Sequence, residues 1–262
     1  MKAIILAAGY ATRLHPLTLN TPKALLPIGG RAMLDHLVEG IARIENMKEV
    51  HIVSNRKFSA HFEAWKAQAE QEERYPQLTF RIWNDGTRTS ADCLGAVGDI
   101  DYVIRHAALD DDILVAAADN FFTFPLKLFV EAFYRQGRDM LLAGYIPDVE
   151  TLRRFAVAEL DQSGRVLSLE EKPEHPRSHT GIYALYIYRK ETLPLFGEYL
   201  ASGEDPDSPG RFPEWLCRTG REMGAYTFEG ECVDIGTHQS YEEVCAQYGG
   251  KQSLKQNIQT GK

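Results

Sequence analysis

The chain has 262 residues, of which 44% are hydrophobic and 25% are charged, and its formal net charge is −8. This composition is typical of a globular protein with one large domain and an ample hydrophobic core. The negative charge argues against binding to nucleic acid, because phosphates need cationic partners. No apolar run approaches the roughly 20 residues that cross a bilayer, and the first residues do not read as a signal peptide. We therefore expect a cytoplasmic protein with no membrane partner.

Apolar runs alternate with amphipathic helical patterns through the first half of the chain. Such alternation is typical of βαβ units, so we predict an α/β fold with a mostly parallel, Rossmann-like sheet and helices on both faces. In these sheets ligands bind beyond the carboxyl ends of the strands. The predicted strands cover residues 2–8, 49–55, 79–85, 112–120 and 139–146, and the predicted helices cover residues 33–44, 58–73, 94–107 and 125–137.

The second half of the chain is richer in strand patterns. Two strands over 155–172 with a turn at 162–164, a strand over 179–189 and a strand-like stretch over 223–236 indicate a small β-rich lobe. Helical patterns cover 191–203, 212–220 and 237–249, the last with Thr237 as a plausible N-cap. Residues 202–210 read as a mobile surface loop. We expect one domain over 1–250, followed by a polar tail over 251–262.

The segment after the first strand, LAAGYATRLHPLTLNTPKALLPIGG, shows neither a helical nor a strand period. Gly9 can adopt backbone angles closed to other residues, Arg13 can grip two phosphate oxygens, and Lys23 can supply a mobile charge. Successive free N–H groups in such a loop bind anions. These parts predict a polyphosphate cradle. The alternative is a solvent-exposed loop with ordinary surface cations, and neither GxxxxGK[ST] nor GxGxxG is present.

The same segment resembles the signature of the sugar-1-phosphate nucleotidylyltransferases, LAAGxGTRLxPLTxxxPKxLLP, with Ala11 where the family usually has Gly. Five later segments resemble further family motifs in the same order. They are LGAVGD (94–99), AADN (117–120), EEKP (170–173), HTGIYAL (179–185) and CVDIGTHQSY (232–241).

This resemblance implies attack of a sugar 1-phosphate oxygen on the α-phosphorus of a nucleoside triphosphate, with release of pyrophosphate. It implies a nucleotide-binding half over 1–150 and a sugar-binding half over 151–250. Arg13 and Lys23 would be the catalytic cations, and Asp119 and Asp234 would hold Mg²⁺. Position alone leaves each aspartate open as a helix N-cap or as a partner for a nearby arginine.

The resemblance also assigns binding residues. Lys172 would contact the sugar phosphate and Glu171 the sugar hydroxyls, although a surface salt bridge between Lys172 and its neighbours is the simple alternative. A close packing contact is nearly as good an interpretation of Gly144. The nucleotide-binding set comprises Leu6, Ala7, Ala8, Gly9, Thr12, Asn84, Leu94 and Gly95; the sugar-phosphate-binding set comprises Asn120, Gly144, Glu171, Lys172, Thr180, Gly181 and Tyr183.

The substrates are less sharply indicated than the reaction. Gly95 can permit close packing of a flat base, but the Gln that pyrimidine-reading members often carry has no counterpart here. We expect dTTP or UTP with glucose 1-phosphate first. Guanylyl or cytidylyl transfer to mannose, heptose or an alcohol phosphate stays open, as does a non-catalytic regulator that binds a sugar nucleotide. The resemblance leaves a homo-oligomer open too.

Overall fold

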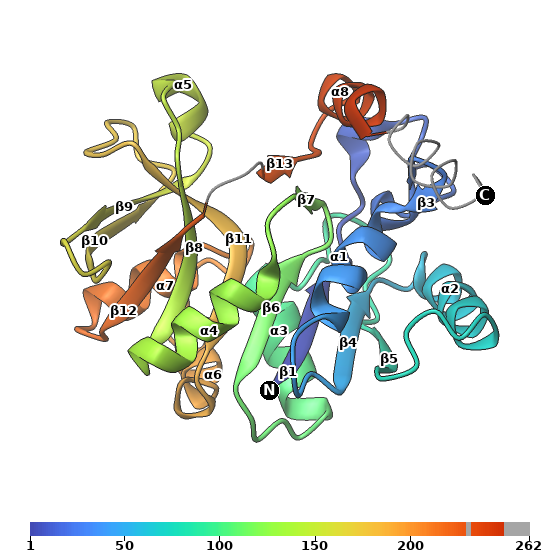
Figure 1. Ribbon diagram of the computed structural model, residues 1–262, viewed down its shortest axis with the longest axis horizontal. Coiled ribbons are helices and arrows are strands. Elements are labelled where there is room, and N and C mark those ends of the chain that lie inside the picture. Colours follow the sequence, from blue (N-terminus) through green and yellow to red (C-terminus); the bar gives the residue numbers. More distant parts are fainter. Residues whose placement is uncertain (229–231, 249–262) are drawn as a thin grey trace, which may run out of the picture.

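The computed structural model describes residues 1–228 and 232–248, and of Asp234 only the main chain. Its central strand is β1 (Lys2–Leu6), which pairs in parallel with β4 (Glu49–Ser54) on one side and β6 (Ile113–Ala117) on the other. β5 (Thr79–Asn84) extends the sheet beyond β4, also in parallel. These four strands confirm the predicted parallel βαβ core, in which all carboxyl ends meet at one edge (Figure 1).

The rest of the main sheet is mixed. β11 (Thr180–Tyr188) runs antiparallel to β6, to β8 (Asp139–Tyr145) and to β9 (Ala156–Leu160), and thereby joins the two halves of the chain. β10 (Val166–Glu171) completes a hairpin with β9, and β12 (Met223–Thr227) pairs in parallel with β8. The sugar-binding half expected from the resemblance therefore continues the same sheet, as Figure 1 shows.

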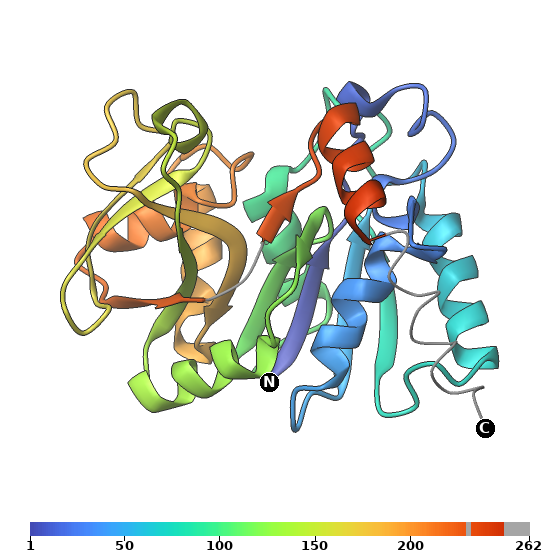
Figure 2. The same ribbon diagram turned by 45° about the horizontal axis from the view of Figure 1, so that its top comes forward.

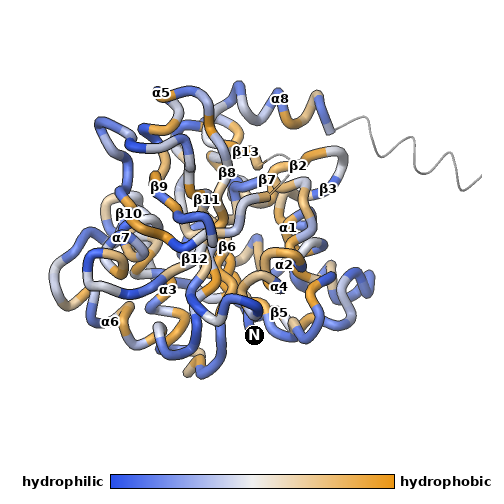
Figure 3. Tube along the Cα trace, turned by 60° about the vertical axis from the view of Figure 1, so that its left-hand side comes forward, coloured by the Kyte–Doolittle hydropathy of each residue, from blue (hydrophilic) through white to orange (hydrophobic). Residues whose placement is uncertain are grey.

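Helices cover both faces of the sheet, because the strand residues alternate between two apolar clusters. Ala3 and Ile5 of β1 pack with side chains of α1 (Met33–Ala42), α2 (Ser59–Gln71) and α4 (Leu126–Gln136). Ile4 packs on the opposite face with α3 (Gly95–His106), α6 (Pro194–Ala201) and α7 (Arg211–Arg218). Figure 3 shows the resulting apolar centre and polar outer surface.

Short elements at the carboxyl edge of the core were not predicted. The 112–120 strand divides into β6 and a separate β7 (Asn120–Phe122), which pairs with β13 (Cys232–Asp234) in a sheet of its own. β2 (Pro27–Ile28) and β3 (Arg31–Ala32) form a small hairpin, and α5 (Val149–Leu152) follows β8. Figure 2 shows β13 and α8 (His238–Tyr248) above the core strands, beside the segment that follows β1. The predicted tail over 251–262 lies outside the described residues.

His51 on β4 is a fully buried polar side chain, with 0% of its surface exposed. Its Nδ1 accepts a hydrogen bond from Trp83 Nε1 at 2.9 Å, which places the ring proton on Nε2, 3.4 Å from Glu49 Oε1. Burial lowers the pKa of His51 from 6.5 to about 4, and the cations Lys2 and Arg81 act in the same direction.

We predict that His51 makes the fold sensitive to acid. Because the folded-state pKa lies below the unfolded one, its contribution to stability is complete above about pH 6.5 and is lost as the pH falls towards 4. At pH 5 the loss is about 2 kcal/mol, by linkage from these two pKa values. Urea unfolding at pH 7 and pH 5 measures it. His51→Asn, which keeps an acceptor for Trp83, should lose this part of the pH dependence; an equal slope in both proteins would contradict the assignment.

Candidate active site

The segment between β1 and α1, called here the signature loop (residues 9–30), begins at the carboxyl edge of the core. Ala11 has φ 47° and ψ 44°, a left-handed conformation, and its carbonyl accepts hydrogen bonds from Thr18 Oγ1 at 2.8 Å and Leu14 N at 3.0 Å. Gly9 does not have a positive φ. The expectation for Gly9 was therefore wrong: the left-handed turn falls on Ala11, where the resembling family usually has Gly.

Asn55 fastens the start of this loop and was missed by the sequence analysis. Its side chain is fully buried, donates to the carbonyl of Ala8 at 2.7 Å and accepts from Phe58 N at 3.0 Å. The bond ties the end of β1 to the turn between β4 and α2. A polar residue directly after the apolar run of β4 was the available signal.

Lys23 and Asp119 meet at the carboxyl edge of the core. Lys23 Nζ lies 2.8 Å from Asp119 Oδ2, and the side chains are 14% and 38% exposed. Asp119 is held there because Ala118 N bonds the carbonyl of Leu6, and Ile235 N bonds the carbonyl of Asp119 itself, both at 3.0 Å. The structure thus joins one predicted catalytic cation to one predicted metal-binding carboxylate, 96 residues apart. Arg13 lies exposed in the short 3-10 helix Thr12–Leu14 of the same loop.

The β7–β13 ladder brings the second predicted metal ligand to the same place. Asp234 pairs in register with the buried Asn120, next to Asp119 in the chain. The side chain of Asp234 is outside the described part of the structure. Among described side chains no group of three metal-ligating residues occurs. Mg²⁺ needs no such cage, since one or two carboxylates with water and substrate phosphate suffice. Asp119 fits that use, because its carboxylate already accepts a cation.

α8 packs against the signature loop and forms hydrogen bonds with it. Tyr241 Oη donates to the carbonyl of Pro27 at 2.7 Å, and His238 Nε2 donates to the carbonyl of His15 at 2.9 Å. Val244 of α8 is buried with Ile28 of the loop. Thr237 Oγ1 accepts from Ser240 N at 3.1 Å, which confirms the predicted N-cap.

The segment expected to hold the nucleobase runs from the end of β5 to the start of α3. Asn84 accepts from Gly86 N through its side chain and from Tyr102 Oη through its carbonyl, both at 2.9 Å. On α3, burial and the neighbouring carboxylate of Asp85 raise the pKa of Asp99 to about 8, so Asp99 is mostly protonated at neutral pH.

Gly95 serves a contact that the sequence analysis did not foresee. It has φ +79°, and a Cβ there would lie 2.5 Å from the carbonyl oxygen of Pro206. The main chain at Pro206 approaches so closely that only glycine fits at position 95. This contact explains the glycine without a bound base. Leu94 is the N-cap residue of α3.

Glu171 and Lys172 lie where β10 ends. Glu171 is 8% exposed, and burial raises its pKa. Lys172 has φ 51°, and its Nζ donates to Ser208 Oγ at 2.7 Å and lies 3.7 Å from Glu171 Oε1. A simple surface salt bridge does not describe this pair, because the carboxylate is buried and the ammonium is held by a hydroxyl.

The remaining predicted sugar-binding residues belong to β8 and β11. Gly144 pairs in register with Gly181. The space beside Gly144 is filled by the ring of Tyr183, and the space beside Gly181 by Ile146. Close packing is therefore sufficient to explain both glycines. Thr180 begins β11 next to them.

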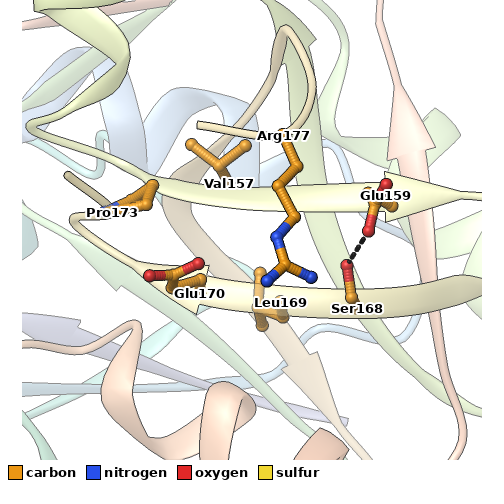
Figure 4. A pocket seen from close by; sticks show the side chains of 7 residues that line it. All are labelled: Val157, Glu159, Ser168, Leu169, Glu170, Pro173 and Arg177. Atoms are coloured by element: carbon orange, nitrogen blue, oxygen red, sulfur yellow. Dashed lines mark hydrogen bonds between the residues drawn. The ribbon is translucent and has the colours of Figure 1, made fainter. Parts of the chain in front are cut away.

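A cavity of about 160 Å³ lies at the β9–β10 hairpin (Figure 4). The guanidinium of Arg177 reaches across it towards Ser168, which donates to Glu159 at 2.6 Å. The cavity is lined by Val157, Glu159, Ser168, Leu169, Glu170, Pro173 and Arg177. None of the predicted site residues is among them.

The chain matches the family model described as Nucleotidyl transferase over residues 2–250, and it belongs to this family. It is 28% identical over 250 residues to a glucose-1-phosphate thymidylyltransferase of Streptomyces griseus, covering 93% of this chain and 65% of that one. It is 26% identical to the UTP--glucose-1-phosphate uridylyltransferase AglF of Haloferax volcanii, covering 93% and 95%. The chain spans about two fifths to two thirds of the length of four of its curated relatives.

Among solved structures, a UDP-glucose pyrophosphorylase complexed with UDP-glucose matches with a TM-score of 0.80 at 19% identity, covering 95% of this chain and 98% of that one. This likeness confirms the predicted fold class. No helix in residues 1–228 and 232–248 is both long and apolar enough to cross a membrane. The structure places the predicted site residues, but their roles stay predictions.

The left-handed Ala11 gives a testable consequence for stability. An L-residue in this conformation is strained by roughly 1–2 kcal/mol, whereas Gly adopts it freely at some cost in unfolded-state entropy. Ala11→Gly should therefore raise the free energy of unfolding by about 0.5–1 kcal/mol. Ala64→Gly, in the exposed middle of α2, is the control and should lower it by about 1 kcal/mol. Urea denaturation decides; destabilisation by both substitutions would show that Ala11 is unstrained.

Proposed function

We propose that the chain transfers a nucleotidyl group from a nucleoside triphosphate to a sugar 1-phosphate and releases pyrophosphate. The observation that carries the proposal is the 2.8 Å pair of Lys23 and Asp119 beside the signature loop. It supplies, at the ligand edge of a parallel sheet, the two kinds of charge that the joining of two anions requires.

The nucleophile needs no base from the protein. A phosphate monoester is largely a dianion at neutral pH, since its second pKa is about 6. The task of the site is therefore to place two anions together and to neutralise them. In this proposal Arg13 faces the departing pyrophosphate and Lys23 the α-phosphate region. Both lie on a loop fastened by Asn55 and by α8.

Asp119, with Asp234, would hold Mg²⁺, and the ion when bound would neutralise phosphate oxygens. Asp119 is engaged by Lys23 in the structure. We infer that substrate phosphate takes over Lys23 and so frees the Asp119 carboxylate for the cation. At the other end, Lys172 presents its ammonium to the phosphate of the sugar substrate, and Glu171 faces the sugar hydroxyls.

For the substrates we propose dTTP or UTP with glucose 1-phosphate. The thymidylyl- and uridylyltransferases among the relatives support this choice. A guanylyltransferase for mannose or heptose phosphate is one alternative, and one matching relative is named a mannose-1-phosphate guanyltransferase. A cytidylyltransferase for an alcohol phosphate is the other. A non-catalytic regulator that binds a sugar nucleotide is the second class of function. The chain is 28% identical over 228 residues to a protein named mannose-1-phosphate guanylyltransferase regulatory subunit alpha.

Turnover and a matched pair of aspartate variants test the proposal. Pyrophosphate release with Mg²⁺ is measured over ATP, GTP, CTP, UTP and dTTP, each with several sugar 1-phosphates, and we expect turnover with dTTP or UTP and glucose 1-phosphate. Asp119→Ala should lower the rate by a factor on the order of 10² to 10³, as expected when a group that stabilises transition-state charge is lost. Asp110→Ala is the control, because Asp110 is exposed and pairs only loosely with Lys190 at 3.2 Å.

One result would contradict the proposed reaction, and another would contradict only the role of Asp119. A wild-type protein that releases no pyrophosphate in the grid, but binds an NDP-sugar, would be a regulator. Normal turnover by Asp119→Ala would remove Asp119 from the metal site while leaving the reaction class in place.

A further inference from the structure

Residues 204–210, called here the strap, belong to the connection between α6 and α7. The strap contacts both the start of α3 and Lys172. The sequence suggested a mobile surface loop, but Ser208 is only 8% exposed. The carbonyls of Pro206 and Asp207 accept hydrogen bonds from Val97 N at 2.9 Å and Ala96 N at 3.3 Å. The strap thus occupies the first turn of α3.

The strap makes this contact through its main-chain carbonyls. The first N–H groups of a helix have no partner within the helix and attract carbonyl oxygens or anions. Here two of them are used by consecutive strap carbonyls. Gly95 lets the strap come this close, since any side chain at that position would collide with Pro206.

The next residue of the strap, Ser208, holds the proposed sugar-phosphate residue. Ser208 Oγ accepts from Lys172 Nζ at 2.7 Å, and Gly210 packs directly against the carboxylate of Glu171. Lys172 sits in a left-handed backbone conformation, which an ordinary residue keeps only when its surroundings hold it. Only Asp207 lies between Ser208 and Pro206 in the strap.

We propose that Ser208 is a positioning residue that couples the two substrate subsites through the strap. The inference rests on the proposed function for the identity of the subsites. The Lys172–Ser208 bond and the bonds from Ala96 and Val97 hold three consecutive residues of the strap, so a change at one bond reaches the other two. Occupation of the nucleotide end stiffens the strap and so sets the ammonium of Lys172 for the sugar phosphate.

A hydrogen-exchange experiment on the full chain without substrates tests the coupling itself. Ser208→Ala removes the bond from Lys172 and the hydrogen bond of the hydroxyl with the Glu171 carboxylate, so the amides of Ala96 and Val97 should exchange about fivefold faster, although neither touches Ser208. Lys172→Met removes only the first bond and should give a smaller acceleration, and the double variant should exchange no faster than Ser208→Ala alone. Ser202→Ala is the control at the start of the same loop, where the hydroxyl bonds only Tyr199 O.

Kinetics then test what the coupling does. Ser208→Ala should raise the KM for the sugar 1-phosphate about fivefold and the KM for the triphosphate by a smaller factor, because the amides that the substitution loosens lie at the nucleotide end. Unchanged exchange at Ala96 and Val97, additive effects in the double variant, or an equal rise of both KM values would overturn the inference while wild-type turnover upheld the proposed function. A wild-type protein without turnover would contradict the proposed function, and the exchange cycle would still decide the coupling.

Discussion

The structure depends on the central position of β1 in a parallel sheet. Because β1 pairs in register with β6, Leu6 lies beside Ala117, and whatever follows either strand emerges at the same edge. The signature loop follows β1, and Asp119 follows β6 by two residues. The 2.8 Å contact between Lys23 and Asp119 is a consequence of that register. A slip of one residue would turn each strand's side chains to the opposite face, so the buried pattern of β1 also secures the site.

The sequence alone predicted this part well. Continuous apolar runs specify strands that are buried on both faces, and polar residues after them mark the ligand edge. What it could not predict are contacts made by groups that every residue possesses. Two strap carbonyls accept hydrogen bonds from the first turn of α3, and the carbonyls of His15 and Pro27 accept hydrogen bonds from side chains of α8. Because every residue has a carbonyl, the amino-acid sequence does not indicate such contacts. A stretch rich in Gly, Pro, Ser and Asp reads as a loop whether it is packed or free.

The glycines were recognised in the sequence, but the contacts that require them were not. A small residue in a motif indicates close approach, but not what approaches. Gly144 and Gly181 meet Tyr183 and Ile146. Ala11 lies in the left-handed region although its side chain carries no sign of it, because the conformation is imposed by the bonds that its carbonyl accepts.

The course of the chain explains how a site between two halves keeps its geometry. β11 joins the halves within one sheet by pairing β6 at one end and β8 and β9 at the other. After β12 the chain returns to the part of the fold that holds β1, where β13 pairs with β7 and α8 contacts the signature loop. Lys23, Asp119 and α8 thus come from three distant stretches, fastened by hydrogen bonds to main-chain carbonyls. In the proposed function the site acts by holding charges in place, and these hydrogen bonds keep Lys23 and Asp119 where that function needs them.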